Sequence, residues 1–301
     1  MTVAEDIAAG RLRWASEPRL GGSVNEDRVG MSREAVWVLD GAGTPAGVSS
    51  CCDKDAAWYV ERIDAALNRQ LEQRDDAPLV EILAAAIADV QHEHAAGCAE
   101  PTSGRGPSST VAIARRRGTW LDTLVLGDST ILLDHGTHVA TIRDTRLAEI
   151  APELRREIKT AIAAGHGYRQ AEHEHRRAEL VHAERQSRNR DGGYWIAADD
   201  PTAATHALTA RYPIGPVPTG IRRVVLMTDG AHRATSMFAI YDSESTLLDA
   251  ANSTGPASCI RQIRSVEAED ASGRQHPRTK HSDDASLVLW NMSDRPEGRS
   301  A

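Results

Sequence analysis

The sequence predicts an α+β fold built from short buried strands and long helices. Two apolar runs end in Asp-Gly, within residues 34–43 and 222–230, which is typical of buried strands that stop at a turn. Apolar residues recur every three or four positions over 54–73 and 78–95, the spacing of amphipathic helices. Further apolar runs over 108–140 are separated by short turns and predict a meander of strands.

The first half of the chain is expected to run strand, helix, helix and meander. The run over 34–43 places Asp40 at the end of its strand. Pro78 stands in the first turn of the second helix, where an N–H group would have no partner and proline is tolerated. Residues 100–107 have the composition of a loop, and the meander follows them.

A charged helical insert is expected at about 146–190. The segment is rich in Arg, Glu, His and Ala, and Gly165 and Gly167 divide it into two helical parts. Its histidines lack the HExxH pattern of a metal site, so a solvated helix face is the favoured interpretation. They are His166, His173, His175 and His182. Basic pairs such as Arg176-Arg177 could contact a phosphorylated substrate, with a plain solvated surface as the default.

The last third of the chain returns to strands and helices. Asp200 and Pro201 predict a capped helix that runs through Leu208. The remaining elements are expected in the order strand, helix, helix and strand, at 222–227, 247–252, 257–268 and 286–290. Since no repeat and no long linker interrupts the chain, we expect one domain over 1–292, followed by a polar tail at 293–301.

The composition excludes several classes of protein. The chain has 35 Lys and Arg against 43 Asp and Glu, a net charge of −8, which is too acidic for a protein that coats nucleic acid. An aromatic content of 4% leaves no base-stacking surface. The N-terminus lacks a signal-peptide pattern, and no apolar run approaches about 18 residues. We therefore expect a cytoplasmic protein with neither nucleic acid nor a membrane as partner.

The four cysteines give a weak signal. Cys51, Cys52, Cys98 and Cys259 show neither CxxC spacing nor a dense framework. Reduced thiols are the simplest interpretation, and a disulfide or a zinc site is the less favoured alternative. The chemistry is therefore sought elsewhere.

Acidic residues stand at the edges of the apolar runs. They are Glu26-Asp27, Asp40, Asp128, Asp229 and Asp283-Asp284. Each one alone is most simply a turn former or a helix cap. Together, carboxylates gathered at strand ends repel one another, so a cluster of them needs a cation. Oxygen ligands without Cys or His select Mg²⁺ or Mn²⁺, and two such ions are suited to phosphoester hydrolysis.

Six short motifs add a family resemblance. They are Asn25-Glu26-Asp27-Arg28, Val38-Leu39-Asp40-Gly41, Ser108-Ser109-Thr110, Leu126-Gly127-Asp128-Ser129, Leu226-Met227-Thr228-Asp229-Gly230 and Asp283-Asp284-Ala285-Ser286. In this order and rough spacing, over about residues 20–290, the sequence resembles a divergent, bacterial-type member of the metal-dependent type 2C protein phosphatases (PPM family). The resemblance implies a four-layer α-β-β-α sandwich of two antiparallel sheets flanked by helix pairs, with metals in a cleft at one end.

The resemblance also implies roles for the acidic residues. Asp40 would bridge two metals, and the Gly41 carbonyl with Glu26 would bind the second. The first metal would be completed by Asp229 and Asp283. In the same scheme Asp27 would contact metal-bound water, Asp128 would bind a weaker third metal, and Asp284, where the family commonly has Asn, is the less favoured direct ligand.

Two departures from the family pattern matter. Some members have a His, proposed as general acid, two residues after the bridging Asp, where this chain has Ala42. A proton would then come from water, or from His232 or His281, each expected to be a bystander. The phosphate-binding Arg of the family also lacks a clear match, and Arg19 is the nearest upstream candidate.

The expected activity is hydrolysis of phosphoserine or phosphothreonine monoesters, with Mn²⁺ or Mg²⁺ as cofactor. The substrate would be a phosphoprotein or, alternatively, a phosphorylated small molecule. A second alternative is a catalytically weak, phosphatase-like binding module. It is disfavoured because the expected metal-ligand positions carry suitable carboxylates.

Overall fold

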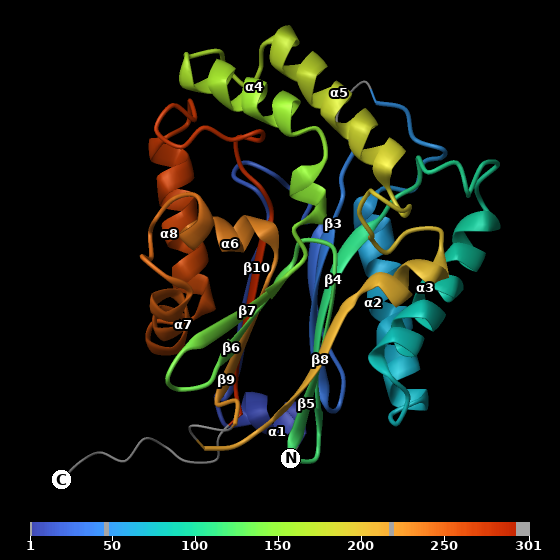
Figure 1. Ribbon diagram of the computed structural model, residues 1–301, viewed down its shortest axis with the longest axis vertical. Coiled ribbons are helices and arrows are strands. Elements are labelled where there is room, and N and C mark those ends of the chain that lie inside the picture. The colour runs from blue at the N-terminus through green and yellow to red at the C-terminus, as the bar shows by residue number, and fades with distance from the viewer. Residues whose placement is uncertain (1, 45–47, 217–219, 293–301) are drawn as a thin grey trace.

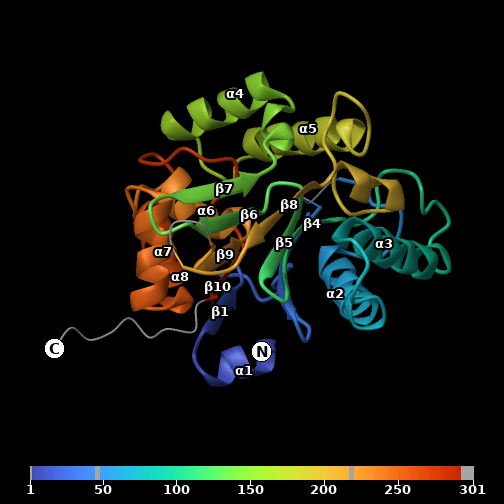
Figure 2. The same ribbon diagram turned by 60° about the horizontal axis from the view of Figure 1, so that its bottom comes forward.

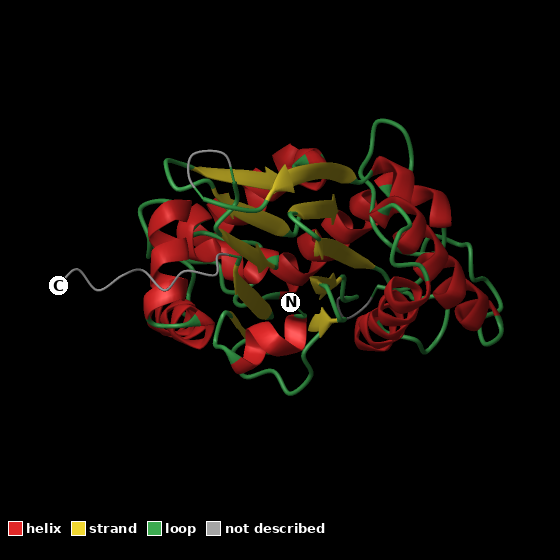
Figure 3. Ribbon diagram, turned by 90° about the horizontal axis from the view of Figure 1, so that it is seen from below, coloured by secondary structure: helices red, strands yellow, loops and turns green. Residues whose placement is uncertain are grey.

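Two stacked antiparallel sheets form the centre of the molecule. The computed structural model describes residues 2–44, 48–216 and 220–292, so the tail predicted at 293–301 lies outside the described residues. In this part of the chain each sheet has five strands, and helices cover its outer face (Figure 1). Seen from below, the sheets are separate layers between the helices (Figure 3). The predicted α-β-β-α sandwich is confirmed.

The first sheet carries the predicted meander. Its order is β2 (Asp27–Met31), β3 (Ala35–Gly41), β4 (Ser109–Arg117), β5 (Trp120–Leu126) and β8 (Leu208–Pro213). The helices on its outer face are α2 (Ala56–Gln73) and α3 (Leu79–Ala95). In β3, Trp37 and Leu39 pack with these helices, whereas Val36 and Val38 pack with the other sheet. Both faces of β3 are buried, which explains its unbroken apolar run.

The second sheet joins the two ends of the described chain. Its order is β1 (Leu12–Glu17), β10 (Ala285–Asn291), β9 (Arg223–Met227), β6 (Thr130–Asp134) and β7 (Val139–Arg143). The helices on its outer face are α6 (Asp229–Ser236), α7 (Glu244–Ser253) and α8 (Pro256–Glu269). A short helix, α1 (Val3–Ala8), closes the lower end, where the Trp290 indole donates a 2.7 Å hydrogen bond to buried Asp6.

Aliphatic side chains fill the space between the sheets. Val38 and Ala112 from the first sheet meet Leu226, Val288 and Trp290 from the second in one fully buried cluster. The low aromatic content of the chain is consistent with this mainly aliphatic core. The packing holds the two sheets face to face, so that the strand ends at the top of Figure 1 meet at one edge.

The charged insert crosses this upper edge. It contains η1 (Arg146–Glu149), α4 (Pro152–Ala163) and α5 (Ala171–Ser187), and Gly165 and Gly167 lie between the two longer helices. Figure 2 shows both helices above the sheet ends, with α4 on the side of the second sheet and α5 toward the first. The insert is therefore placed where it can cover a site at the strand ends.

The helices of the sandwich are amphipathic. In α2, Ile63 and Leu67 are fully buried, whereas Glu61 and Arg69 are exposed. Such a helix gains its stability by burying one face against a sheet. Among the described residues, no helix combines the length and the apolar character that crossing a membrane requires.

The prediction of a helix from Asp200 through Leu208 is wrong. Asp200 does cap a helix, through a 2.9 Å hydrogen bond from the Thr202 N–H, but the helix is the short 3₁₀ segment η2 (Pro201–His206). Leu208 instead begins β8, an edge strand paired with β5. Its residues are mostly exposed, so the strand lacks the apolar run that marks the central strands. Neither β1 nor α6 was predicted from the sequence.

Candidate active site

A cleft of about 340 Å³ lies at the upper edge of the sandwich, between the ends of the sheets and the insert. Five predicted site residues line it: Asp40, Gly41, Asp128, Asp229 and Asp283. Basic side chains line it as well, among them Arg143, Arg177, Arg233 and Lys280. We call this region the acidic cleft. The carboxylates come from both sheets, because the buried strands of each end at this edge.

A chain of hydrogen bonds fixes Asp27 beside Asp40. The two residues lie opposite each other in the β2–β3 pairing. Asp27 Oδ2 accepts a 2.7 Å hydrogen bond from the hydroxyl of Thr228, which follows β9 in the second sheet. Thr228 Oγ1 in turn accepts a 3.0 Å hydrogen bond from the Ser286 N–H of β10. These bonds join the two sheets directly beneath the cleft.

Close packing explains the glycine of each Asp-Gly pair. A Cβ atom on Gly41 would lie 2.6 Å from the Glu26 carbonyl oxygen, and one on Gly230 would lie 1.9 Å from the Asp284 carbonyl oxygen. Neither glycine is among the residues with positive φ, so the turn conformation expected from the sequence is not the reason for them. Each Asp-Gly pair instead allows a second acidic segment to approach closely.

The Glu26 segment lies against β3 in this way. The Gly41 N–H donates a 3.0 Å hydrogen bond to the Glu26 carbonyl, and the Gly41 carbonyl accepts one of 3.0 Å from the Gly43 N–H. Burial raises the pKa of Glu26. The guanidinium of Arg19 lies 3.7 Å from the Glu26 carboxylate. Arg19 is half-exposed and is not among the residues that line the cleft.

Asp284 holds this segment in place. Its carboxylate accepts hydrogen bonds of 2.6 Å from the Arg19 N–H and 2.7 Å from the Glu26 N–H. The residue is 5% exposed and is not among those that line the cleft. Oδ1 of Asp284 thus holds Arg19 and Oδ2 holds Glu26, so that each oxygen already has a hydrogen-bond partner.

Asp128 lies in the turn between β5 and β6. Gly127 before it has φ +84°, and a Cβ atom there would come within 2.8 Å of Thr110, so this glycine is required by both conformation and space. The Arg143 guanidinium donates a 3.2 Å hydrogen bond to the Asp128 carbonyl. Burial, with a contribution from the charge of Asp229, raises the pKa of the Asp128 carboxyl to about 7.

The carboxylates near Asp40 form no direct ion pairs among the described residues, although Arg233 and Lys280 lie in the same cleft. Burial is the main reason why the pKa of Asp40 lies well above its usual value, and the charges of Asp27 and Asp229 raise it further. Burial also raises the pKa of Asp27 well above normal, against the effect of the Thr228 hydrogen bond. Among the described residues, no Lys, Arg or His forms an ion pair with Asp27, Asp40, Asp128 or Asp229.

Asp283 differs because two cations contact it. Lys280 Nζ lies 2.9 and 3.0 Å from its two carboxylate oxygens, and Arg233 Nη2 lies 2.6 Å from Oδ2. Burial alone would raise the pKa of Asp283, but these two cations outweigh it and the pKa is lowered. The sequence pattern missed both cations. The available signal was spacing, since Arg233 follows Asp229 by one helical turn and Lys280 precedes Asp283 by three residues.

Arg177 brings positive charge from the insert. It projects from α5 and lines the cleft, as Arg143 does from β7 and Arg155 from α4. Burial lowers the pKa of Arg177, and the charge of Asp283 acts against that change. Its position contrasts with the plain solvated surface that was the default for this segment. Arginine guanidinium groups that line the same cleft as these carboxylates are suited to bind a phosphate.

The histidines do not fill the missing acid position. Neither His232 nor His281 is among the residues that line the cleft, whereas Ala42 is. His232 is buried, its Nε2 lies 3.8 Å from a Glu244 carboxylate oxygen, and burial lowers its pKa. The His281 ring packs on Tyr168 with a centroid distance of 5.6 Å. The expectation that both are bystanders agrees with these positions.

The donor atoms of the acidic cleft suit divalent cations by type, but among the described residues no three of its carboxylates bring ligand atoms within 4.8 Å of one another. Buried carboxylates without partners are costly, and a hard cation would remove that cost while accepting the oxygen donors present. Asp40, Asp229 and the Gly41 carbonyl offer such donors, and Glu26 lies next to them. Asp283 fits less simply, because a metal there would compete with Lys280 and Arg233.

Comparison with known families identifies the family to which the chain belongs. The profile described as "Protein phosphatase 2C" matches residues 19–258, and the chain belongs to this family. The match includes Glu26, Asp40 and Asp229 and ends before Asp283. Comparison with curated proteins gave no significant match.

Solved structures share the fold at low sequence identity. The serine/threonine phosphatase PstP/Ppp of Mycobacterium tuberculosis is 16% identical with a TM-score of 0.54, and the alignment covers 94% of this chain and 99% of that one. A bacterial serine phosphatase is 11% identical with a TM-score of 0.57, covering 95% and 98%. The phosphatase Stp1 of Staphylococcus aureus is 10% identical with a TM-score of 0.55, covering 94% of each chain.

Proposed function

We propose that this chain is a metal-dependent phosphatase that hydrolyses phosphoserine and phosphothreonine monoesters. One observation carries the proposal: half-buried carboxylates at the ends of both sheets and arginines from the insert converge on the same cleft. Carboxylates suit divalent metals, and arginines suit phosphate. Family membership supports the reaction class.

In this proposal the carboxylates divide into two overlapping ligand sets. Asp40 belongs to both. Asp229 and Asp283 would complete one set, and Glu26 with the Gly41 carbonyl would complete the other. Asp128, at the mouth of the β5–β6 turn, would hold a weaker third ion. The ions supply a nucleophilic water and neutralise charge on the phosphate when bound.

The remaining groups position the reactants. Asp27, whose Oδ2 accepts a hydrogen bond from Thr228, would accept a hydrogen bond from the attacking water. Arg177 and Lys280 face the same space and would bind the phosphate oxygens. Since Ala42 stands where some relatives have a histidine, the leaving alkoxide would take its proton from water.

The metals proposed are Mn²⁺ or Mg²⁺. Both accept all-oxygen ligand sets, and the donors here include neither Cys nor His. One solved structure of PstP, 16% identical to this chain with a TM-score of 0.52, is described as a complex with two manganese ions. That precedent favours Mn²⁺ as the first metal to test.

Hydrolysis of p-nitrophenyl phosphate tests the proposal. We expect turnover with Mn²⁺, none with EDTA, and at least about a hundredfold loss in Asp40→Asn, because one ligand of both metals is removed. Asp242→Asn, an exposed carboxylate on the loop before α7, is the matched control and should behave like the wild-type protein. Metal-independent turnover, or full activity in Asp40→Asn, would refute the assignment.

One observation favours a second function. Lys280 and Arg233 form ion pairs with Asp283, and these would compete with a metal for its carboxylate. With low metal affinity, the chain would be a phosphatase-like module that binds a phosphorylated partner. This alternative predicts phosphopeptide binding without turnover at saturating Mn²⁺. Panels of phosphopeptides and phosphorylated metabolites, assayed for hydrolysis and binding, separate it from the enzymatic proposal and also rank the two classes of substrate.

A further inference from the structure

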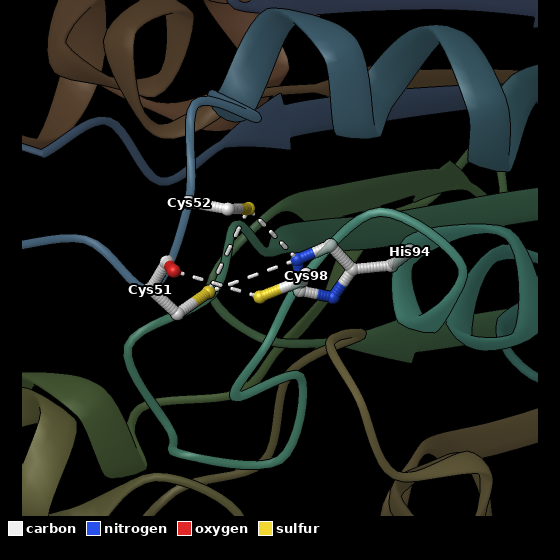
Figure 4. A group of neighbouring side chains, drawn as sticks. All are labelled: Cys51, Cys52, His94 and Cys98. Atoms are coloured by element: carbon white, nitrogen blue, oxygen red, sulfur yellow. Dashed lines mark hydrogen bonds between the residues drawn. The ribbon is translucent and has the colours of Figure 1, made fainter.

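A second group of potential ligands lies outside the acidic cleft. Cys51 and Cys52 lie in the segment before α2, His94 lies in the last turn of α3, and Cys98 follows that helix (Figure 4). One ligand atom from each residue lies within 4.8 Å of all the others. Among the described residues this is the only such group of three or more His, Cys, Asp or Glu side chains. We call it the Cys–His cluster.

The spacing of three of the four ligand atoms is close to that of a tetrahedral zinc site. Zn–S bonds of about 2.3 Å and Zn–N bonds of about 2.0 Å place neighbouring ligand atoms roughly 3.5–3.8 Å apart. In the cluster the sulfur atoms of Cys51 and Cys52 are 3.8 Å apart, and the Nε2 atom of His94 lies 3.7 Å from the first and 3.2 Å from the second. Small shifts of these side chains would complete the geometry.

The surroundings are those of a closed site. His94 is 4% exposed and Cys98 is 8% exposed, while the other two cysteines are half-buried. Gly106 packs against the His94 ring, where a Cβ atom would lie 3.1 Å from Cε1 and 3.6 Å from the Cys51 sulfur. The Trp58 ring lies 5.8 Å from the His94 ring on another side. Four ligands in such a setting leave no position for a substrate.

A disulfide explains the cluster less well. All four cysteines of the chain are free thiols, and the Cys51 and Cys52 sulfurs at 3.8 Å are well beyond an S–S bond of about 2.05 Å. A disulfide would use two of the three thiols and would give His94 no role. A soft metal uses all four side chains, and thiolate with imidazole selects Zn²⁺ over Mg²⁺ or Mn²⁺.

We propose that Cys51, Cys52, His94 and Cys98 bind one structural Zn²⁺ ion. The thiols release their protons to solvent as the metal binds, and neutral His94 binds through Nε2. The ion would join the segment that follows β3 to the end of α3. It therefore differs from the metals of the acidic cleft in donor type, coordination and purpose, and the proposal does not depend on the proposed phosphatase activity.

The zinc site would support the helix that covers the cleft. Arg185 of α5 donates hydrogen bonds of 2.6 Å to the Ser49 carbonyl and 2.8 Å to the Thr44 hydroxyl. Arg188, just after the helix, donates one of 3.0 Å to the Gly106 carbonyl. Thr44 and Ser49 precede Cys51 and Cys52 in the chain, and Gly106 lies in the loop that follows Cys98. The metal would thus fix the surface on which the end of α5 rests.

The test measures metal content and coordination in the full chain. Protein purified under reducing conditions should contain one equivalent of zinc, and Cys98→Ser should bind zinc more than about a hundredfold more weakly, since removing a direct ligand exceeds the effect of an outer-shell change. Cobalt substitution should give thiolate-to-metal absorption and the visible bands of a tetrahedral site. Cys259→Ala, which changes a buried thiol in α8, is the matched control and should match the wild-type protein.

Further variants keep the test decisive. Asp40→Asn should retain both the zinc and the cobalt spectrum, which separates this site from the acidic cleft. If Cys98→Ser does not fold, Cys52→Ser at a half-buried position replaces it. Three results would overturn the proposal. The first is wild-type protein that is purified without zinc and binds none that is added, and the second is a cobalt spectrum that is unchanged in the ligand variants. The third is a disulfide between cysteines of the cluster in protein purified under reducing conditions.

Discussion

The acidic cleft and the Cys–His cluster gather ligand atoms in opposite ways. In the cleft, oxygen donors are interleaved with the cations Lys280, Arg233 and Arg177 around a volume of about 340 Å³. In the cluster, three sulfurs and one imidazole nitrogen lie within 4.8 Å of one another. The first arrangement leaves room and charge for a phosphate, whereas the second uses every position for protein ligands. A metal site with a free coordination position suits catalysis, whereas a site closed by four protein ligands suits structural support.

Paired variants should break this comparison if it is wrong. Asp229→Asn should lower kcat by at least about a hundredfold and leave the zinc content unchanged, because only the cleft loses a ligand. In EDTA the variant should be at least as stable as the wild-type protein, because it removes one of several unpaired carboxylates. Steady-state kinetics, metal analysis and thermal melting measure these effects.

The reciprocal variant is Cys98→Ser. It should lose zinc and melt at a lower temperature, while kcat at 25 °C falls much less than in Asp229→Asn, because Cys98 does not line the cleft and the zinc would act on the cleft only through the end of α5. A fall in kcat as large as that of Asp229→Asn would show that the two sites are not separate in function.

Gly230→Ala should have the next largest effect. The new Cβ atom would meet the Asp284 carbonyl at 1.9 Å, so the segment that carries Asp283 must move. We expect a loss of roughly 1–3 kcal/mol in the free energy of unfolding and a loss of activity, with zinc retained. Gly97→Ala is the control, since a Cβ atom there meets nothing within 4 Å, and its effect should stay within about 0.5 kcal/mol. Denaturant titration compares the two, and equal stabilities would contradict the packing argument.

Lys280→Met tests whether cations and metals compete. Removing the ammonium group from Asp283 should strengthen Mn²⁺ binding by up to about tenfold, because less charge opposes the metal. Lys159→Met removes the same charge from the rim of the cleft and should change Mn²⁺ affinity less. Calorimetric titration with Mn²⁺ measures both, and weaker binding in Lys280→Met would mean that the lysine supports the metal site.

The smallest effect separates two arginines. Arg177→Ala should raise KM for a phosphopeptide by about tenfold, because it removes a charged partner of the phosphate from the cleft. Arg19→Ala should change KM less, since Arg19 faces Glu26 and does not line the cleft. Steady-state kinetics at saturating Mn²⁺ ranks the two, and the reverse order would restore the sequence-based prediction.

The sequence predicted what local patterns encode. Asp40 and Asp229 follow buried apolar strands, so their positions at strand ends could be read from the run that precedes each. The edge strand β8 was missed because its residues are mostly exposed and carry no apolar run. Its residues gain their partners only when β5 is beside them.

Contacts between distant segments were beyond the sequence patterns. Cys51 and Cys52 lie more than 40 residues from His94 and Cys98, and only the packing of α2 beside α3 brings them together. The His-x-x-x-Cys spacing at the end of α3 was the available signal, but it lacks the familiar CxxC pattern. For Arg177 the sequence left contact with a phosphorylated substrate open, with a solvated surface as the default, because its neighbours are polar and its cleft is formed by other elements.

The pairing of β1 with β10 has a consequence for how this protein is made. The segment that presents Asp283 and Asp284 directly precedes β10, and Asp284 reaches back across 258 residues to hold Glu26. Translation must therefore extend through β10 before the cleft has its full set of carboxylates. Under the proposed function, the nascent polypeptide would therefore stay inactive until this segment has emerged and β10 has paired with β1.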